Sequence, residues 1–134
     1  MSKVSLILDL LKEVSQPSDQ QALVHYLRTE TQTDNREILD SIVLDSDLIP
    51  NVDWLLQNQA LRHEILWTLV NLTAASTLAC SKLMKEEFGI LGVFSESLKA
   101  SDRGKEHQLV LWSLNNLLAD SCDSVQSSVI VGIP

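Results

Sequence analysis

The sequence predicts an all-α protein, and more narrowly an α-solenoid of about three helical repeats. Apolar residues make up 45% of the chain but aromatic residues only 4%, a balance that favours packed helices over a β-sandwich. Residues 61–76 recur in similar form as residues 106–121, 45 positions later. Helical repeats with a period of about 40–45 residues are typical of solenoids, because each unit buries its apolar face only by stacking on its neighbours.

Apolar residues at helical spacing predict the individual elements. In the first helix Leu6, Leu10 and Val14 recur every four residues, with Ile7 and Leu11 beside them. No segment shows the period-two alternation that a half-buried strand requires. The predicted helices cover residues 4–15, 19–30, 34–44, 50–58, 59–75, 76–88, 91–100, 105–119 and 123–131.

Three junctions that contain isoleucine recur along the chain. They are Leu48-Ile49-Pro50, Gly89-Ile90 and Gly132-Ile133-Pro134, and their isoleucines are 41 and 43 positions apart. Proline suits the first turn of a helix, where its missing N–H costs nothing, so a helix is expected to begin at each junction. The chain is therefore expected to be a single domain, with a partial first repeat at about 1–33, further repeats at 34–76 and 77–121, and the start of a fourth at 122–134.

Charge and cysteine content narrow the partners and the compartment. The formal net charge of −8 argues against nucleic acid and anionic membranes and suits a basic partner, although many soluble proteins are simply acidic. Cys80 and Cys122 form no metal-binding pattern and are expected to be thiols in a reducing compartment. Asp9, Lys12 and Glu13 interrupt the apolar N-terminus at helical spacing, so we expect no signal peptide and a cytoplasmic or nuclear location.

Two Trp-x-x-x-Asn pairs are the strongest candidates for a binding site. Trp67 is followed four residues later by Asn71, and Trp112 by Asn116. Residues four apart share one face of a helix, so two such pairs in neighbouring repeats would form a ladder of indoles and carboxamides. Asp120 lies one turn beyond the second Asn and adds a carboxylate to that ladder.

The alternative is that the two tryptophans are core residues. The apolar stripes expected in the core are Ile65, Leu69 and Leu72 in the first copy and Val110, Leu114 and Leu117 in the second. Both Trp-Asn pairs lie off these stripes, and a buried Asn would need hydrogen-bond partners, so we favour an exposed position. Asp120 is interpreted as a binding carboxylate, the alternative being a solvated residue at a helix end, where an acid is unfavourable. Trp54 is expected to pack between helices.

These motifs resemble armadillo repeat proteins and, more narrowly, importin-α, the adaptor that recognises nuclear localisation signals. The residues that carry the resemblance are the two Trp-x-x-x-Asn pairs, Trp67 with Asn71 and Trp112 with Asn116, together with Asp120. The resemblance implies a right-handed superhelix with a concave groove that binds an extended Lys/Arg-rich peptide. It also implies that successive indoles form slots for Lys and Arg stems, that each Asn bonds the peptide backbone, and that Asp120 pairs with one Lys.

The sequence departs from the importin-α pattern in identifiable places. The predicted helix at residues 19–30, which corresponds to the two Trp-bearing helices, has no Trp-x-x-x-Asn pair. The place of the Trp falls at His25 or Tyr26, followed one turn later by Thr29 or Glu30. Ala75 stands in the first copy where the second has its carboxylate. No basic N-terminal segment of the kind that binds importin-β is present in the sequence.

The remaining motifs predict a binding protein that is not an enzyme and has no cofactor. There is no Gly-rich phosphate loop and no nucleophile elbow, and His25, His63 and His107 have no mutual spacing for a metal. The predicted function is recognition of basic segments of cargo proteins in nuclear import. The alternative is an armadillo scaffold that docks a larger assembly or forms a homodimer through exposed solenoid ends.

Overall fold

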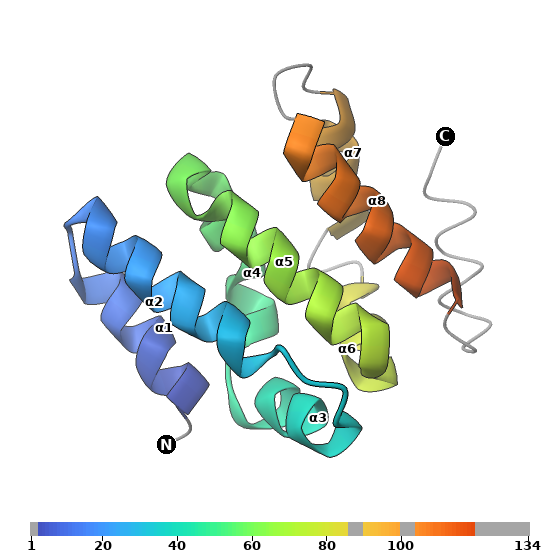
Figure 1. Cartoon of the computed structure of the whole chain (residues 1–134), viewed down its shortest axis with the longest axis horizontal. Coiled ribbons are helices and arrows are strands. Elements are labelled where there is room, and N and C mark those ends of the chain that lie inside the picture. Colours follow the sequence, from blue (N-terminus) through green and yellow to red (C-terminus); the bar gives the residue numbers. More distant parts are fainter. Residues whose placement is uncertain (1–2, 86–89, 100–103, 120–134) are drawn as a thin grey trace.

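The computed structural model describes residues 3–85, 90–99 and 104–119, and every regular element in these ranges is a helix (Figure 1). The prediction of an all-α protein is confirmed for the described part of the chain. None of its helices is both long and apolar enough to span a membrane. The helices are α1 (Lys3–Glu13), α2 (Pro17–Glu30), α3 (Arg36–Asp45), α4 (Leu48–Gln57), α5 (Gln59–Ala75), α6 (Thr77–Leu83), α7 (Ile90–Lys99) and α8 (Gly104–Ala119).

Side-chain caps explain where helices such as α3 and α6 begin. Asn35 caps α3, and its Oδ1 accepts hydrogen bonds from the backbone N–H groups of Glu37 and Ile38 at 3.0 and 3.3 Å. Ser76 caps α6 by accepting from the N–H of Ala79 at 3.0 Å. Each bond satisfies a backbone donor that has no partner within the helix.

Three helices lie side by side in the order α2, α5, α8, with α5 in the middle (Figure 1). Each of them also packs against the helix that precedes it in the chain, so that α1 meets α2, α4 meets α5 and α7 meets α8. Helix α3 packs against α4, α5 and α6. A pair of packed helices is thus seen at three successive places, α1 with α2, α4 with α5 and α7 with α8. The second members of these pairs, α2, α5 and α8, are called the inner helices below.

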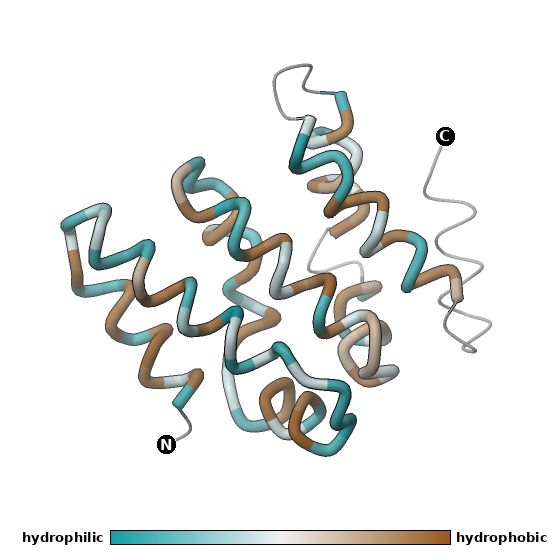
Figure 2. The backbone as a smooth tube through the Cα atoms, in the orientation of Figure 1, coloured by the Kyte–Doolittle hydropathy of each residue, from teal (hydrophilic) through white to brown (hydrophobic). Residues whose placement is uncertain are grey.

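The apolar stripes predicted for the core are buried. Along α5 and α8 hydrophobic and hydrophilic segments alternate (Figure 2), and the predicted stripe of each helix lies in the core. Burial of one such side chain contributes about 1.5–3 kcal/mol, so these stripes hold the row of helices together. The buried residues are Ile65, Leu69 and Leu72 in α5 and Val110, Leu114 and Leu117 in α8.

Helix α1 buries a different face from the one centred on Leu6 and Leu10, and both of these side chains are exposed. The apolar face turned inward combines Ile7 and Leu11 with two further residues, Val4 and Leu8. Since α1 lies at one end of the row and packs mainly against α2 and α4, only one of its two Leu-bearing faces is covered.

Trp54, which was expected to pack between helices, is 37% exposed. Its indole Nε1–H donates to Oδ1 of Asn51 within the same helix, α4. The predicted helix at 123–131, the junction at residues 132–134, Cys122 and Asp120 lie outside the described residues. Of the predicted junction isoleucines, Ile49 and Ile90 are buried at the beginnings of α4 and α7.

Candidate functional site

The two predicted tryptophans lie on neighbouring inner helices and touch. The ring centroids of Trp67 on α5 and Trp112 on α8 are 5.5 Å apart, with an angle of 65° between the ring planes. This edge-to-face arrangement is a favourable aromatic contact. Trp67 is partly buried against the core, whereas Trp112 is 49% exposed. The two rings thus contact each other directly, whereas the family resemblance implies a slot between successive indoles.

Asn71 joins α5 to α2. Its Nδ2 donates to Oγ1 of Thr31 at 3.1 Å and to the backbone oxygen of Arg28 at 3.5 Å. Thr31 follows directly after the last residue of α2, and its own hydroxyl donates to the backbone oxygen of Arg28 at 2.8 Å. The carboxamide therefore binds the C-terminal turn of α2, where backbone oxygens lack partners within the helix.

Asn116 makes the same contact one helix further along. Its Nδ2 donates to Oγ1 of Thr73 at 3.1 Å and to the backbone oxygen of Val70 at 3.3 Å. Once again the two acceptors are three residues apart and lie in the last part of the preceding inner helix. In both Trp-x-x-x-Asn motifs the Asn therefore binds the preceding inner helix.

The repeated Asn contact gives an alignment of α2 with α5, in which Arg28 and Thr31 correspond to Val70 and Thr73. In this alignment His25 stands at the place of Trp67, and Thr29 at the place of Asn71. The sequence alone left His25 and Tyr26 as alternatives for this place. The indole position of α2 is thus taken by an imidazole, which is exposed.

A second repeated contact follows the same alignment at the other end of the inner helices. In each case a side-chain nitrogen near the beginning of the inner helix donates to a backbone oxygen near the end of the preceding helix. The three bonds join Gln20 Nε2 to Val14 O at 3.1 Å, Arg62 Nε to Leu56 O at 2.9 Å, and His107 Nε2 to Ser97 O at 2.7 Å. Nε2 of His107 must carry a proton in this contact, because a carbonyl oxygen only accepts.

Charged side chains surround Trp67 in a cluster that sequence reasoning missed. The guanidinium carbon of Arg28 lies 6.0 Å from the Trp67 ring centroid, within the range of a cation–π contact. Arg28 Nε is 2.6 Å from Oε2 of Glu64, and both side chains are 24% exposed. The pair is held by charge rather than by an aligned hydrogen bond. The only sequence signal was the placing of Glu64 one turn before Trp67.

A different ion pair joins α5 to α8. Nη1 of Arg62 lies 3.7 Å from Oε1 of Glu106, and the two side chains are only 10% and 14% exposed. Charges so far removed from water are weakly screened, but each loses hydration when it is buried. The pair therefore serves as an internal link between helices rather than as a surface that attracts a partner.

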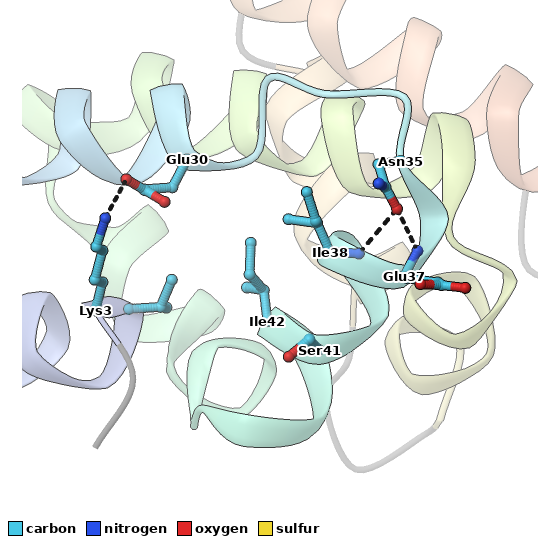
Figure 3. Close-up of a pocket in the computed structure, with 8 residues that line it drawn as sticks. Lys3, Glu30, Asn35, Glu37, Ile38, Ser41 and Ile42 are labelled. Carbon is cyan, nitrogen blue, oxygen red and sulfur yellow. Dashed lines mark hydrogen bonds and ion pairs between the residues drawn. The ribbon is translucent and has the colours of Figure 1, made fainter.

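Among the described residues, two hollows lie beside the inner helices. One of about 420 Å³ opens between α1, α2 and α3, where Nζ of Lys3 lies 4.0 Å from Oε1 of Glu30 (Figure 3). The other, of about 250 Å³, lies at the C-terminal ends of α5 and α8, with Arg36, Thr73 and Asn116 in its lining. Asp120, the predicted Lys partner, lies outside the described residues. In the ranges that the structure describes, no three His, Cys, Asp or Glu side chains are placed to hold a metal ion.

No model of a known protein family matches the chain, and no curated protein sequence matches it significantly.

Proposed function

We propose that the chain is a right-handed armadillo-type solenoid of about three repeats that binds Lys/Arg-rich extended segments. The inner helices α2, α5 and α8 would line the concave groove, as the third helices do in importin-α. The two contacts that recur from helix to helix, one at each end, support a repeating architecture. Recognition of nuclear-localisation-like segments of cargo in nuclear protein import is the function that this proposal implies.

The observation that carries the proposal is the shared arrangement of the two Asn side chains. Both Asn71 and Asn116 use Nδ2 to bind the preceding helix. Among the described residues neither Oδ1 accepts a hydrogen bond, and each remains available as an acceptor. An extended peptide has backbone N–H groups that need such acceptors at regular intervals. Two equivalent carboxamides on adjacent helices meet that requirement.

Trp112 supplies the surface for a cation. Its half-exposed indole offers an aromatic face on which the methylenes and the charge of a Lys or Arg side chain can rest. The net charge of −8 adds a long-range attraction for basic segments. Asp120 remains the proposed partner of one Lys, because it lies one helical turn beyond Asn116 in the sequence.

Fluorescence anisotropy with a labelled Lys-rich peptide tests this function. We expect binding at low salt that weakens as salt rises, and its loss in Trp112→Ala and Asp120→Lys. Trp54→Ala is the matched control for the first variant, because Trp54 is also partly exposed but lies on α4. Asp9→Lys makes the same change of charge at an exposed residue of α1 and is the control for the Asp120→Lys variant. The proposal is wrong if no peptide binds at low salt.

The alternative is a scaffold that self-associates through the ends of the row. Leu6 and Leu10 are exposed on α1 at one end, and Leu111 is exposed on α8 at the other. Unpaired apolar ends of a short solenoid favour end-to-end contact. Light scattering after size exclusion would detect it, and Leu6→Glu would disrupt it while leaving peptide binding unchanged.

A further inference from the structure

We infer that the guanidinium of Arg28 occupies the face of the Trp67 indole, so that a Lys or Arg of a bound peptide can stack only on Trp112. This inference rests on the proposed function and adds a specificity rule to it. The part of the groove between α2 and α5 is occupied by the chain's own guanidinium. A bound peptide would therefore need only one well-placed Lys or Arg.

The contacts of Trp67 leave little of its ring for a ligand. Arg28 lies over the ring at 6.0 Å, and Trp112 meets the same ring edge-to-face at 5.5 Å. One cation and one aromatic group are thus already supplied from within the chain. Among the described residues no cation lies over Trp112, so the two indoles are not equivalent.

Glu64 holds Arg28 in this place. The Nε–Oε2 distance of 2.6 Å joins two side chains that are three-quarters removed from solvent, and such a pair is screened less than a fully exposed one. The carboxylate that would otherwise attract a ligand cation to this part of the groove is therefore already neutralised. A peptide Lys would have to displace Arg28 from both Glu64 and the indole of Trp67.

His25 completes the cluster at the place where a third indole would stand. Its Nδ1 lies 3.2 Å from Nη2 of Arg28 and 3.3 Å from Oε1 of Glu64. An unprotonated Nδ1 accepts from the guanidinium, and a protonated one donates to the carboxylate. In either state the imidazole contacts the Arg28–Glu64 pair and helps to close this end of the groove.

Two peptides of equal length can show that the Trp67 indole is occupied and that the Trp112 indole is open. One has a single Lys, and the other has two Lys residues two positions apart, which point to the same side of an extended chain. We expect the wild-type protein to bind them with affinities within about twofold of each other, because only Trp112 is open. In Arg28→Ala we expect the two-Lys peptide to gain about fivefold over the one-Lys peptide, as a new cation site would provide.

Two further variants distinguish ring occupation from a change of charge. Lys12→Ala removes the same charge from an exposed place on α1 and should leave the ratio of the two affinities unchanged. Arg28→Lys keeps a cation beside Glu64 and should restore a ratio near that of the wild type. An unchanged ratio in Arg28→Ala, with both peptides bound and the helix content intact, contradicts the inference.

A ligand-free measurement keeps the inference testable if no peptide binds and the proposed function fails. In a Trp54→Phe, Trp112→Phe background, Trp67 is the only Trp of the chain. We expect acrylamide to quench its fluorescence more strongly after Arg28→Ala, since the guanidinium no longer covers the ring. Equal quenching with and without Arg28 would show that the indole is not occupied.

Discussion

Helix α5 packs against α2 on one side and α8 on the other, and these two helix–helix interfaces are called here the α2–α5 and α5–α8 junctions. They share a hydrogen-bonding pattern and differ in charge. At both, an Asn carboxamide binds a Thr hydroxyl and a backbone oxygen of the preceding inner helix. At the α2–α5 junction the charges of Arg28 and Glu64 lie partly exposed beside Trp67. At the α5–α8 junction the charged pair is largely buried, and the exposed group is an indole.

This difference shows that repetition of a structural contact does not make two sites equivalent. The Asn contacts set the alignment of neighbouring helices, and that alignment brings the Trp positions of adjacent inner helices together. Whether an indole is covered is decided by the residues around it, such as His25 and Arg28 on α2. The proposed binding position therefore lies on the α5–α8 side, where the exposed indole is.

The largest effect is expected from the core of α5, which both junctions share. Leu69 is fully buried, so Leu69→Ala should lower the free energy of unfolding by about 2–5 kcal/mol through lost burial and the cavity left behind. Urea denaturation followed by circular dichroism measures it. Leu6→Ala, on the exposed face of α1, should cost well under half as much. Equal losses would contradict the burial difference between these residues.

The two ion pairs provide the next contrast. Glu106→Gln leaves the nearly buried Arg62 without its partner charge and should cost about 2–4 kcal/mol. Glu64→Gln, at the more exposed α2–α5 junction, should cost about 1 kcal/mol. Denaturation at low and high salt should show a larger salt dependence for the Glu64 pair. A larger loss from Glu64→Gln than from Glu106→Gln would reverse the comparison.

Effects no larger than that of Glu64→Gln should come from the two carboxamides, and they should be alike. Asn71→Ala and Asn116→Ala each remove bonds to one hydroxyl and one backbone oxygen, and we expect each to cost about 1 kcal/mol. Thermal unfolding of the two variants under one set of conditions compares them. Peptide affinity should fall further in Asn116→Ala, because its neighbour Trp112 is the open indole. A stability loss confined to one variant would show that the contacts are not equivalent.

The sequence was sufficient to predict the helices and the buried faces of α5 and α8. These depend on local periodicity: Ile65, Leu69 and Leu72 recur at helical spacing, and the apolar residues beside them, Leu66 and Val70, are buried as well. In α1, by contrast, leucines occupy two faces, and periodicity does not select between them. Contact with α2 and α4 decides that Leu8 and Leu11 are covered and Leu6 is not.

The placing of the Trp and Asn residues along their helices was predicted from the sequence, but their contacts were not. Spacing placed each Trp and Asn on one face of its helix, which requires no knowledge of neighbouring helices. The contact between Trp67 and Trp112 and the position of Arg28 over Trp67 depend on how adjacent helices are offset along their axes. That offset is set by interhelical bonds such as Asn71 to Thr31, which a single sequence does not reveal. The role of Asp120 stays a prediction.

The indole N–H resonances of the three tryptophans test the central claim most directly, because each reports one place in the chain. A Lys-rich peptide is titrated into isotope-labelled protein, and single Trp→Phe variants assign the signals. We expect the Trp112 resonance to move most, the Trp67 resonance to move less, and the Trp54 resonance to stay in place. A titration that leaves Trp112 unmoved, or that shifts Trp54 most, would contradict a basic-peptide site on the α5–α8 side.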